Sequence, residues 1–365
     1  MIRSRLFIVA ALLSAACTLS PGVPVSTTPA AASTAATGTV VHDTVRSAAL
    51  RGNPLGDPAD RHVAIYLPPS YAAEPSRRYP VVYLLHGFDG DPEQWAEERM
   101  RVPQAMDSLV AAGTVREMVV VMPDGKNALG GSFFANSPAT GRWEDFAVRE
   151  VVAHVDRRYR TLPGPAGRGI AGWSMGGHAA LRLAAAHPEV FGAAYALSPC
   201  CLGDLWADFG PRGGTADQMA EPWRRAMSLR SREEVAAAGF GVRLRLALAA
   251  LLSPDPSGRP VGVALPFTWA MDGTYPAQPA HSAWDRASPD SLVARHLRGF
   301  ARLRGVAFDA GRTTGSGTSR RARERCRPPS RAPGSGTPTS CTPVRTGATS
   351  RGGFARTSSP SSRSA

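Results

Sequence analysis

Residues 170–181 read IAGWSMGGHAAL and place Ser174 in a Gly-x-Ser-x-Gly pattern. In this pattern a serine can sit on a sharp strand-to-helix turn and act as a nucleophile. The next backbone N–H, that of Met175, then faces the oxyanion that develops on the substrate. The pattern also arises by chance about 0.3 times in a chain of this length and composition. Its neighbours must therefore distinguish a nucleophile from an ordinary small residue in a turn.

A second oxyanion donor is expected about 85 residues earlier, in the loop of the sequence VVYLLHGFDG. The run PVVYLLHG is apolar throughout, as a central strand covered on both faces should be. Gly87 and Gly90 let the backbone approach a substrate, and the N–H of Phe88 is the expected donor. We expect His86 to fix the shape of this loop through its ring nitrogens, and His178 to be a surface or capping residue.

Short β-branched runs alternate with longer Ala/Leu/Arg stretches, which indicates a sheet covered by helices. We predict a mostly parallel sheet, and we expect helices over 202–293 to form an insertion over one end of it. The predicted strands are 61–67, 81–85, 118–122, 168–172, 193–198 and 306–310, and the predicted helices are 100–112, 146–159 and 177–187.

The two ends of the chain differ in composition from its middle. In residues 1–17, Arg3 and Arg5 precede an apolar run, which is the layout of a secretory signal. Cys17 follows SAA, so both ordinary cleavage and lipid attachment at Cys17 remain open. Residues 18–39 form an Ala/Ser/Thr/Pro-rich leader, 40–311 the expected catalytic domain, and 312–365 an Arg/Ser/Pro/Gly-rich tail that we expect to be disordered.

The net charge of +13 lies mostly in the tail. Residues 311–365 contain 11 Arg and one acidic residue, a net +10, which leaves +3 for the rest of the chain. A near-neutral body lacks the basic patch of a nucleic-acid-binding domain, so no nucleic-acid partner is expected. The five cysteines show no metal-ligand spacing, and Cys200 and Cys201 are interpreted as small buried residues. No metal and no organic cofactor are expected.

Five motifs in order resemble the esterase D and antigen 85 type branch of the α/β-hydrolases: YLLHGFDG, VVMPDG, SFFANSPATGRWEDF, AGWSMGGHAALRLAAAHPEVFGAAYALSP and VAFDAG. The resemblance implies an α/β-hydrolase fold with helices on both faces of the sheet. It also implies that Ser174 is the nucleophile and that the amides of Phe88 and Met175 form the oxyanion hole. Phe133 and Trp143 lie in the stretch that lines the site in this family, although packing is an equal alternative for Trp143.

The resemblance fails after VAFDAG, where the family places an acid and then a histidine behind one more strand. No histidine follows residue 311, so the last strand and helix are expected to be missing. Asp309 is a candidate substitute acid, with a structural role as the alternative. A frameshift near Arg312 would explain the break, because the frame starting at the third codon base permits Asp, Asp, Gly, Phe, Gly, His, Ile, Pro from there. The competing interpretation is an authentic basic arm that binds anionic cell-envelope polymers.

These features predict a secreted serine carboxylesterase that acts on small-molecule or polymer-linked acyl esters through a Ser174 acyl-enzyme. Its activity should be impaired, because the triad acid and histidine are not found. The alternatives are an acyltransferase of the antigen 85 type and a noncatalytic envelope-binding protein. An extracytoplasmic location is expected, with an anchor if Cys17 carries a lipid. The sequence leaves the acyl group, the alcohol and the oligomeric state open.

Overall fold

The computed structural model of the chain describes residues 36–98, 100–202, 205, 216–266, 268, 277–285 and 289–309. The expected signal sequence with Cys17, most of the leader and the tail after residue 311 lie outside these ranges. Within them, no helix is both long enough and apolar enough to cross a membrane.

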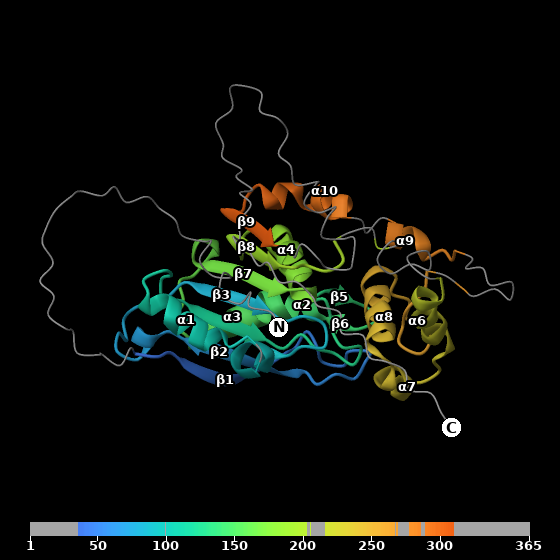
Figure 1. Cartoon of the computed structure of the whole chain (residues 1–365), viewed down its shortest axis with the longest axis horizontal. Coiled ribbons are helices and arrows are strands. Elements are labelled where there is room, and N and C mark those ends of the chain that lie inside the picture. The colour runs from blue at the N-terminus through green and yellow to red at the C-terminus, as the bar shows by residue number, and fades with distance from the viewer. Residues whose placement is uncertain are drawn as a thin grey trace, which may run out of the picture. The chain divides into compact units, whose positions relative to one another are not determined.

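The central sheet has seven strands in the order β1-β2-β4-β3-β7-β8-β9 (Figure 1). Strand β2 pairs antiparallel with both β1 and β4, and the remaining pairings are parallel. This mostly parallel sheet confirms the expected α/β-hydrolase fold. The strands are β1 Thr39–Arg46, β2 Asp60–Leu67, β3 Val81–Leu85, β4 Val119–Pro123, β7 Arg168–Trp173, β8 Ala193–Leu197 and β9 Gly305–Asp309, and a separate two-stranded ribbon joins β5 Asn136–Ser137 to β6 Gly141–Arg142.

The central strands form because their residues are apolar on both faces. All five residues of β4 are buried, as are four of the five in β3. Helices therefore cover both sides of the sheet, as expected. On one face, Trp95 and Met106 from the helical turn after β3 and from α1 join a core with Tyr66 and Met122. On the other face, the residues that follow β7 in α4 pack against a second core.

Helix α4 can approach the sheet closely because its inward positions are mostly alanine. Ala179, Ala180, Leu183 and Ala184 have no exposed surface. The helices are α1 Val102–Ala111, α2 Trp143–Asp145, α3 Val152–Arg158, α4 Met175–Ala186, α6 Ala216–Ser228, α7 Arg232–Ala237, α8 Phe240–Leu252, α9 His281–Asp285 and α10 Pro289–Phe300, with 3-10 turns η2 Pro69–Tyr71 and η5 Pro165–Gly167 and π-helical turns η3 Gln94–Glu98 and η4 Phe146–Val151.

All six predicted strands are confirmed within one residue at each end, and the three predicted helices are confirmed with small shifts. Helix α4 begins at Met175, two residues earlier than expected, so it starts immediately after Ser174. The predicted helix 146–159 opens with the π-helical turn η4 and continues as α3. The described part of 202–293 is largely helical, as expected for the insertion. Strand β1 was not predicted, because the sequence TVVHDTVR is half polar and its eight residues are ordered by pairing with β2.

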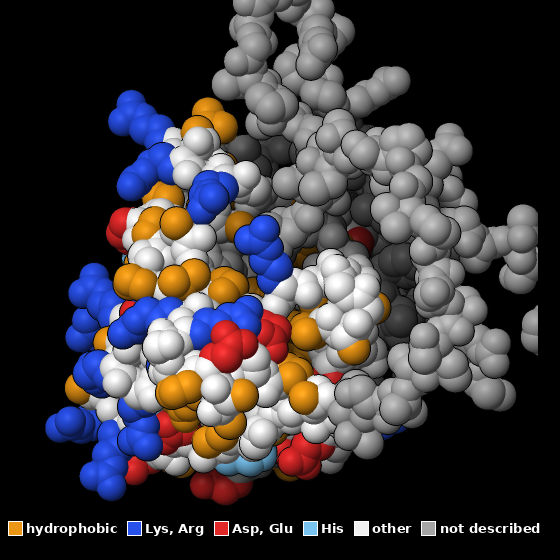
Figure 2. Space-filling view, turned by 90° about the vertical axis from the view of Figure 1, so that its left-hand side faces the viewer, with side chains coloured by type: hydrophobic (Ala, Val, Ile, Leu, Met, Phe, Trp, Pro, Cys, Tyr) orange, Lys and Arg blue, Asp and Glu red, His pale blue; other side chains and the backbone are white. Residues whose placement is uncertain are grey.

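Many surface arginines of the body lie near carboxylates. On the face drawn in Figure 2, Lys and Arg side chains spread along one side, with Asp and Glu between and beside them. Among these pairs, Arg77 contacts Glu74 and Glu117, and Arg168 contacts Asp156. This pairing agrees with the low net charge calculated for the body from its sequence.

Candidate active site

Ser174 occupies a strained turn between β7 and α4. Its backbone φ is 54° and its ψ is −114°, a left-handed region that a serine enters only when its surroundings impose it. The surroundings are two glycines that leave no room for a side chain. A Cβ on Gly172 would lie 2.3 Å from the Gly176 oxygen, and a Cβ on Gly176 would lie 2.2 Å from the Leu85 oxygen. The Gly-x-Ser-x-Gly pattern is therefore required for strand β3, strand β7 and helix α4 to meet closely at this turn.

Three backbone hydrogen bonds fix the position of Ser174. Its N–H donates to the Leu197 oxygen at 3.0 Å, and its own oxygen accepts from the N–H groups of His178 at 3.0 Å and Cys200 at 3.1 Å. The residue itself is half-buried. A rigid turn with a partly accessible hydroxyl is what a nucleophile at this position would need.

The loop after β3 lies directly beside Ser174. A Cβ on Gly87 would come within 3.6 Å of the Ser174 Cβ, and one on Gly131 would meet both the Met175 sulfur at 2.4 Å and the Phe88 ring at 2.9 Å. Phe88 and Met175 are thus brought together around Ser174. Over the described ranges, the backbone N–H groups of these two residues donate to no other protein group. Two free donors beside a serine hydroxyl are the components of an oxyanion hole.

His86 holds this loop in place, as expected. Its Nε2 lies 2.9 Å from the Gly125 nitrogen, which can only donate, so Nε2 is the acceptor and Nδ1 carries the proton. Nδ1 then donates to the Gly87 oxygen at 2.8 Å. Complete burial lowers the pKa of His86, which keeps the ring neutral. With both nitrogens engaged in this way, His86 cannot serve Ser174 as a general base.

An ion pair ties the same loop to the helical insertion. Asp89, with a left-handed φ of 60°, accepts hydrogen bonds of 2.5 and 2.7 Å from the guanidinium of Arg243 in α8. The Phe88 ring meets Phe240 edge to face, with ring centroids 5.4 Å apart. More than half of the Phe240 surface is exposed, at 54%. Phe240 therefore offers an apolar surface next to the loop beside Ser174.

None of the chain's eight histidines, all of which are described, hydrogen-bonds to the Ser174 hydroxyl. His178 comes closest in the chain, one helical turn after Ser174. Its ring packs edge to face against Phe133 at 5.8 Å, and burial lowers its pKa to about 4. His178 is therefore a half-buried, neutral residue that packs against Phe133, which differs from the surface or capping residue that was expected.

Asp309 ends β9 and is engaged with its neighbours. Its Oδ1 accepts from the Ser198 N–H at 2.9 Å, and its Oδ2 accepts from the Tyr195 hydroxyl at 3.3 Å. In the described chain, no histidine contacts its carboxylate. The contacts fit the structural role that was the alternative for this residue, namely bracing the end of β8 against β9.

Phe133 and Trp143 are placed in the core, although both lie near the site in the fold. Both side chains have no exposed surface. The Trp143 indole N–H donates to the Thr140 oxygen at 2.9 Å, and the guanidinium carbon of Arg61 lies 5.0 Å from the ring centroid. A substrate role for Phe133 or Trp143 is therefore not supported by this geometry, and packing is the better account of Trp143.

Glu144 connects the segment that follows Phe133 to helix α4, a feature that sequence reasoning missed. Its carboxylate pairs with Arg182 and with His187 Nε2, the latter at 2.7 Å. Arg182 also donates to the Phe134 oxygen at 2.7 Å. These partners lower the pKa of Glu144 to about 2 despite its burial, and the pKa of His187 is raised mainly by its hydrogen bond to Glu144. The signal was hidden because Glu144 lies in a different motif from Arg182 and His187, about 40 residues earlier in the chain.

Comparisons with known proteins relate the chain to esterases. The Esterase family model matches residues 58–246. An esterase of Mycobacterium tuberculosis is 31% identical over 152 residues, which cover 40% of this chain and 30% of that protein. An endo-1,4-beta-xylanase/feruloyl esterase of Xylanibacter ruminicola is 30% identical over 136 residues, covering 35% of this chain and 18% of that protein.

Among solved structures, an S-formylglutathione hydrolase from Agrobacterium tumefaciens aligns over 79% of this chain and 80% of its own, with 19% identity and a TM-score of 0.46. Of the two curated relatives, by contrast, the chain spans less than a third of the length of each.

Proposed function

Because this chain belongs to the Esterase family of serine ester hydrolases, we propose that it hydrolyses carboxylic esters by acylation of Ser174. The Ser174 oxygen attacks the ester carbonyl, its proton passes to solvent water in place of a histidine, and the alcohol leaves after taking up a proton. Water then attacks the acyl-enzyme and releases the acid. The N–H groups of Phe88 and Met175 stabilise the negative oxygen in both steps.

The observation that carries this proposal is the strained φ of 54° at Ser174 beside two unpaired N–H groups. A non-glycine residue in this conformation costs about 1–3 kcal/mol, and such strain clusters at functional sites. The glycines at 172 and 176 have close backbone contacts that account for their presence, and the loop of Gly87 comes within contact of Ser174. An ordinary small-residue turn would need none of these arrangements.

We further propose that the activity is low. The geometry gives Ser174 no histidine partner, and Asp309 is bonded to Ser198 and Tyr195. An oxyanion hole and substrate binding without the rest of a triad leave roughly 10³–10⁴-fold acceleration over water. The frameshift near Arg312 remains our explanation for the missing acid and base. Sequencing the gene across codons 305–365 tests it, and an intact frame without insertion or deletion would exclude it.

Hydrolysis of p-nitrophenyl acetate and methyl ferulate by the full-length chain tests the proposed activity. Methyl ferulate is included because one relative is named a feruloyl esterase. We expect a slow rate above buffer that falls in Ser174→Ala to the part that the oxyanion hole and substrate binding supply alone. The matched control is Ser108→Ala, which removes an exposed hydroxyl on α1 and should leave the rate unchanged. A rate that is undiminished in Ser174→Ala would refute the nucleophile, and a kcat within the usual range of about 1–10³ s⁻¹ would refute the impairment.

Transfer of the acyl group to a sugar or glycerol hydroxyl is the second candidate, because it would use the same serine and the same oxyanion donors. Adding trehalose or glycerol to the assay separates the two, since a transferase forms the new ester while a hydrolase forms only the acid.

The absence of a base for Ser174 within the described residues also favours a noncatalytic binding protein, which predicts unchanged ligand binding in Ser174→Ala. We place each of these activities outside the cytoplasm, on the basis of residues 1–17, with envelope attachment if Cys17 is lipidated.

A further inference from the structure

A cluster of two histidines and two glutamates lies on the N-terminal hairpin, away from Ser174. His42 lies on β1 and His62 on β2, whereas Glu93 and Glu97 belong to the helical segment that follows the loop of Phe88. In the β1–β2 register, His42 pairs with Ala64 and Thr44 pairs with His62. The two histidines are therefore diagonal neighbours on the same face of the sheet.

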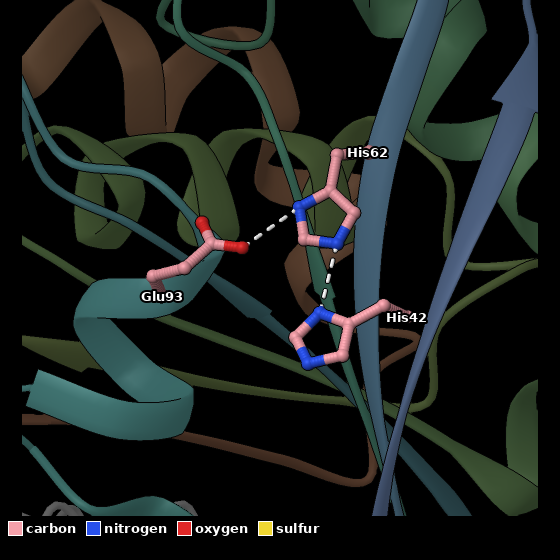
Figure 3. A group of neighbouring side chains, drawn as sticks. All are labelled: His42, His62 and Glu93. Carbon is pink, nitrogen blue, oxygen red and sulfur yellow. Dashed lines mark hydrogen bonds and ion pairs between the residues drawn. The ribbon is translucent and has the colours of Figure 1, made fainter.

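The two imidazoles point toward each other, nitrogen to nitrogen (Figure 3). His42 Nδ1 lies 3.0 Å from His62 Nε2. The other nitrogen of His62, Nδ1, lies 3.0 Å from Glu93 Oε1, and the other nitrogen of His42, Nε2, lies 3.6 Å from Glu97 Oε1. A carboxylate thus faces the outer side of each ring, and the two inner nitrogens face each other.

The roles of the two inner nitrogens depend on the tautomer that each ring adopts. A neutral imidazole has one N–H and one lone pair, so one ring can donate an N–H···N hydrogen bond to the other. When both protons lie on the outer nitrogens, next to the carboxylates, the inner nitrogens instead present lone pairs across only 3.0 Å. Two facing lone pairs repel unless a positive charge lies between them, and the two nearby carboxylates favour positive charge as well.

The arrangement also matches the way proteins prepare histidine for metal binding. A ligating imidazole usually donates its other N–H to a carboxylate, which fixes the ring and raises its basicity. On a tetrahedral Zn²⁺ with Zn–N bonds of about 2.0–2.1 Å, two nitrogen ligands lie about 3.3 Å apart. To accept the ion, the observed separation of 3.0 Å must widen by a few tenths of an ångström, and the two nearly parallel rings must turn so that both lone pairs point to the ion, by roughly 35° each in tetrahedral geometry. His42, His62 and Glu93 also each offer one potential ligand atom, and these atoms lie within 4.8 Å of one another.

We propose that His42 Nδ1 and His62 Nε2 bind a divalent transition metal ion such as Zn²⁺, with Glu93 orienting His62. The side chains of all three residues are partly exposed, at 44%, 32% and 37%, so water can complete the coordination. Imidazole nitrogen is a preferred ligand of Zn²⁺, Ni²⁺ and Cu²⁺. The spacing of residues 42, 62 and 93 matches no metal-binding motif, so the site was not predicted from the sequence.

Metal binding here would fasten the segment after the oxyanion loop to the N-terminal hairpin. Glu93 follows Phe88 by five residues, and Asp91 between them accepts the Gln94 N–H at 3.1 Å at the start of η3. The His62 oxygen accepts the Asp124 N–H at 3.0 Å, and the Asp124 carboxylate lies 3.8 Å from His86 Nε2. The ion would therefore connect His62, which contacts Asp124 beside His86, with Glu93, which follows the loop of Phe88. These two residues reach the loop from opposite ends.

Isothermal titration of the full-length chain with Zn²⁺ tests the site. The accessible cysteines are alkylated first, because thiolates also bind Zn²⁺. We expect one ion per chain, loss of measurable binding in His42→Gln and in His62→Gln, and about 10–100-fold weaker binding in Glu93→Gln. His281→Gln is the control, a partly exposed histidine on α9, and should bind Zn²⁺ like the wild type.

Thermal unfolding with and without Zn²⁺ provides a second measurement. A rise in Tm with Zn²⁺ in the wild type and in His281→Gln, but not in the His42 and His62 variants, supports the site. Equal Tm values without metal show that the variants are folded. No binding at up to about 1 mM Zn²⁺, or undiminished binding in the His42→Gln/His62→Gln double variant, overturns the proposal. The two imidazoles would then form only their N–H···N hydrogen bond.

Discussion

Asp89 and Arg243 form a two-pronged ion pair, with N–O distances of 2.5 and 2.7 Å, between the loop beside Ser174 and helix α8. The two side chains are only 31% and 19% exposed, so water screens the pair less than it would screen an open surface pair. The pair links helix α8 to the loop after β3 at Asp89, whose backbone has a left-handed φ of 60°.

Arg243→Gln should lower the free energy of unfolding by about 1–3 kcal/mol, because it leaves the Asp89 carboxylate without its charged partner. It should also slow the Ser174-dependent esterase rate, since the loop that carries Phe88 loses an anchor. Urea unfolding and p-nitrophenyl acetate hydrolysis measure the two effects. Arg149→Gln is the comparison, because Arg149 is 73% exposed in its pair with Asp145 and such pairs contribute about 0–1 kcal/mol. Equal losses in the two variants would argue against a special role for Asp89–Arg243.

Gly176→Ala should destabilise the fold by at least about 2 kcal/mol, although alanine is the better helix former by about 1 kcal/mol. The added Cβ would lie 2.2 Å from the Leu85 oxygen and 2.7 Å from the His86 oxygen, both backbone atoms that cannot rotate away. Either helix α4 or strand β3 must move. If α4 moves, the N–H of Met175, its first residue, moves with it.

Gly169→Ala is the matched control for Gly176→Ala. Gly169 lies in β7, and a Cβ there would make an ordinary contact of 3.7 Å with Val82. Its urea midpoint should change little or increase, because alanine restricts the unfolded chain. If Gly176→Ala were as stable as Gly169→Ala, the close approach of α4 to β3 would be incorrect.

Local signals in the sequence were enough to predict the elements around Ser174. The run VVYLLHG predicted β3 and the loop after it, and the glycines around Ser174 predicted the turn, because a side chain at 172 or 176 would meet backbone atoms. Residues that are neighbours along the chain carry these signals, so no knowledge of distant contacts was needed. The catalytic role of Ser174 itself stays a prediction until it is measured.

Contacts between distant segments could not be predicted in the same way. The half-polar β1 depends on pairing with β2, and the His42–His62–Glu93 cluster depends on that pairing together with the position of the segment after β3. Trp143 resembled a substrate-contacting residue, but Thr140 and Arg61 enclose it. Polar groups that act through such contacts leave no periodic pattern in the chain.

The stability of the protein should fall as the pH drops from about 6.5 to 4.5, partly because of His178. Burial lowers the pKa of His178 to about 4 from 6.5, so the unfolded chain takes up its proton first. Where the unfolded state binds more protons, stability rises with pH. A difference of this size corresponds to roughly 2–3 kcal/mol when the pH is lowered through the whole window.

His178→Asn removes this titration and should flatten the slope of unfolding free energy between pH 6.5 and 4.5. Urea unfolding at four or five pH values in this window measures the slope. His281→Asn should retain the wild-type slope, because the substitution lies on α9 and leaves His178 in place. An unchanged slope in His178→Asn would show that His178 is not buried as a neutral ring.

Glu144→Gln should destabilise the protein more at pH 5.5 than at pH 9. The pKa of His187 is raised by Glu144, so its contribution is complete below 6.5 and disappears as the pH rises through the raised value. The pKa of Glu144 is lowered from 4.5 to about 2, so its contribution is present above 4.5 and disappears as the pH falls toward 2. The charged pair is therefore complete between about 4.5 and 6.5. At pH 5.5 we expect a loss of about 2 kcal/mol, typical of a hydrogen bond between charged groups.

At pH 9 the loss in Glu144→Gln should be smaller, because neutral His187 no longer forms an ion pair and only the contact of Glu144 with Arg182 remains to be lost. Urea unfolding at the two pH values measures the difference. Glu189→Gln is the control, since Glu189 is 57% exposed and lies 3.3 Å from the other ring nitrogen of His187. Its effect should stay below about 1 kcal/mol at both pH values. An equal loss at pH 5.5 and 9 in Glu144→Gln would mean that Arg182, and not His187, carries the stabilising interaction with Glu144.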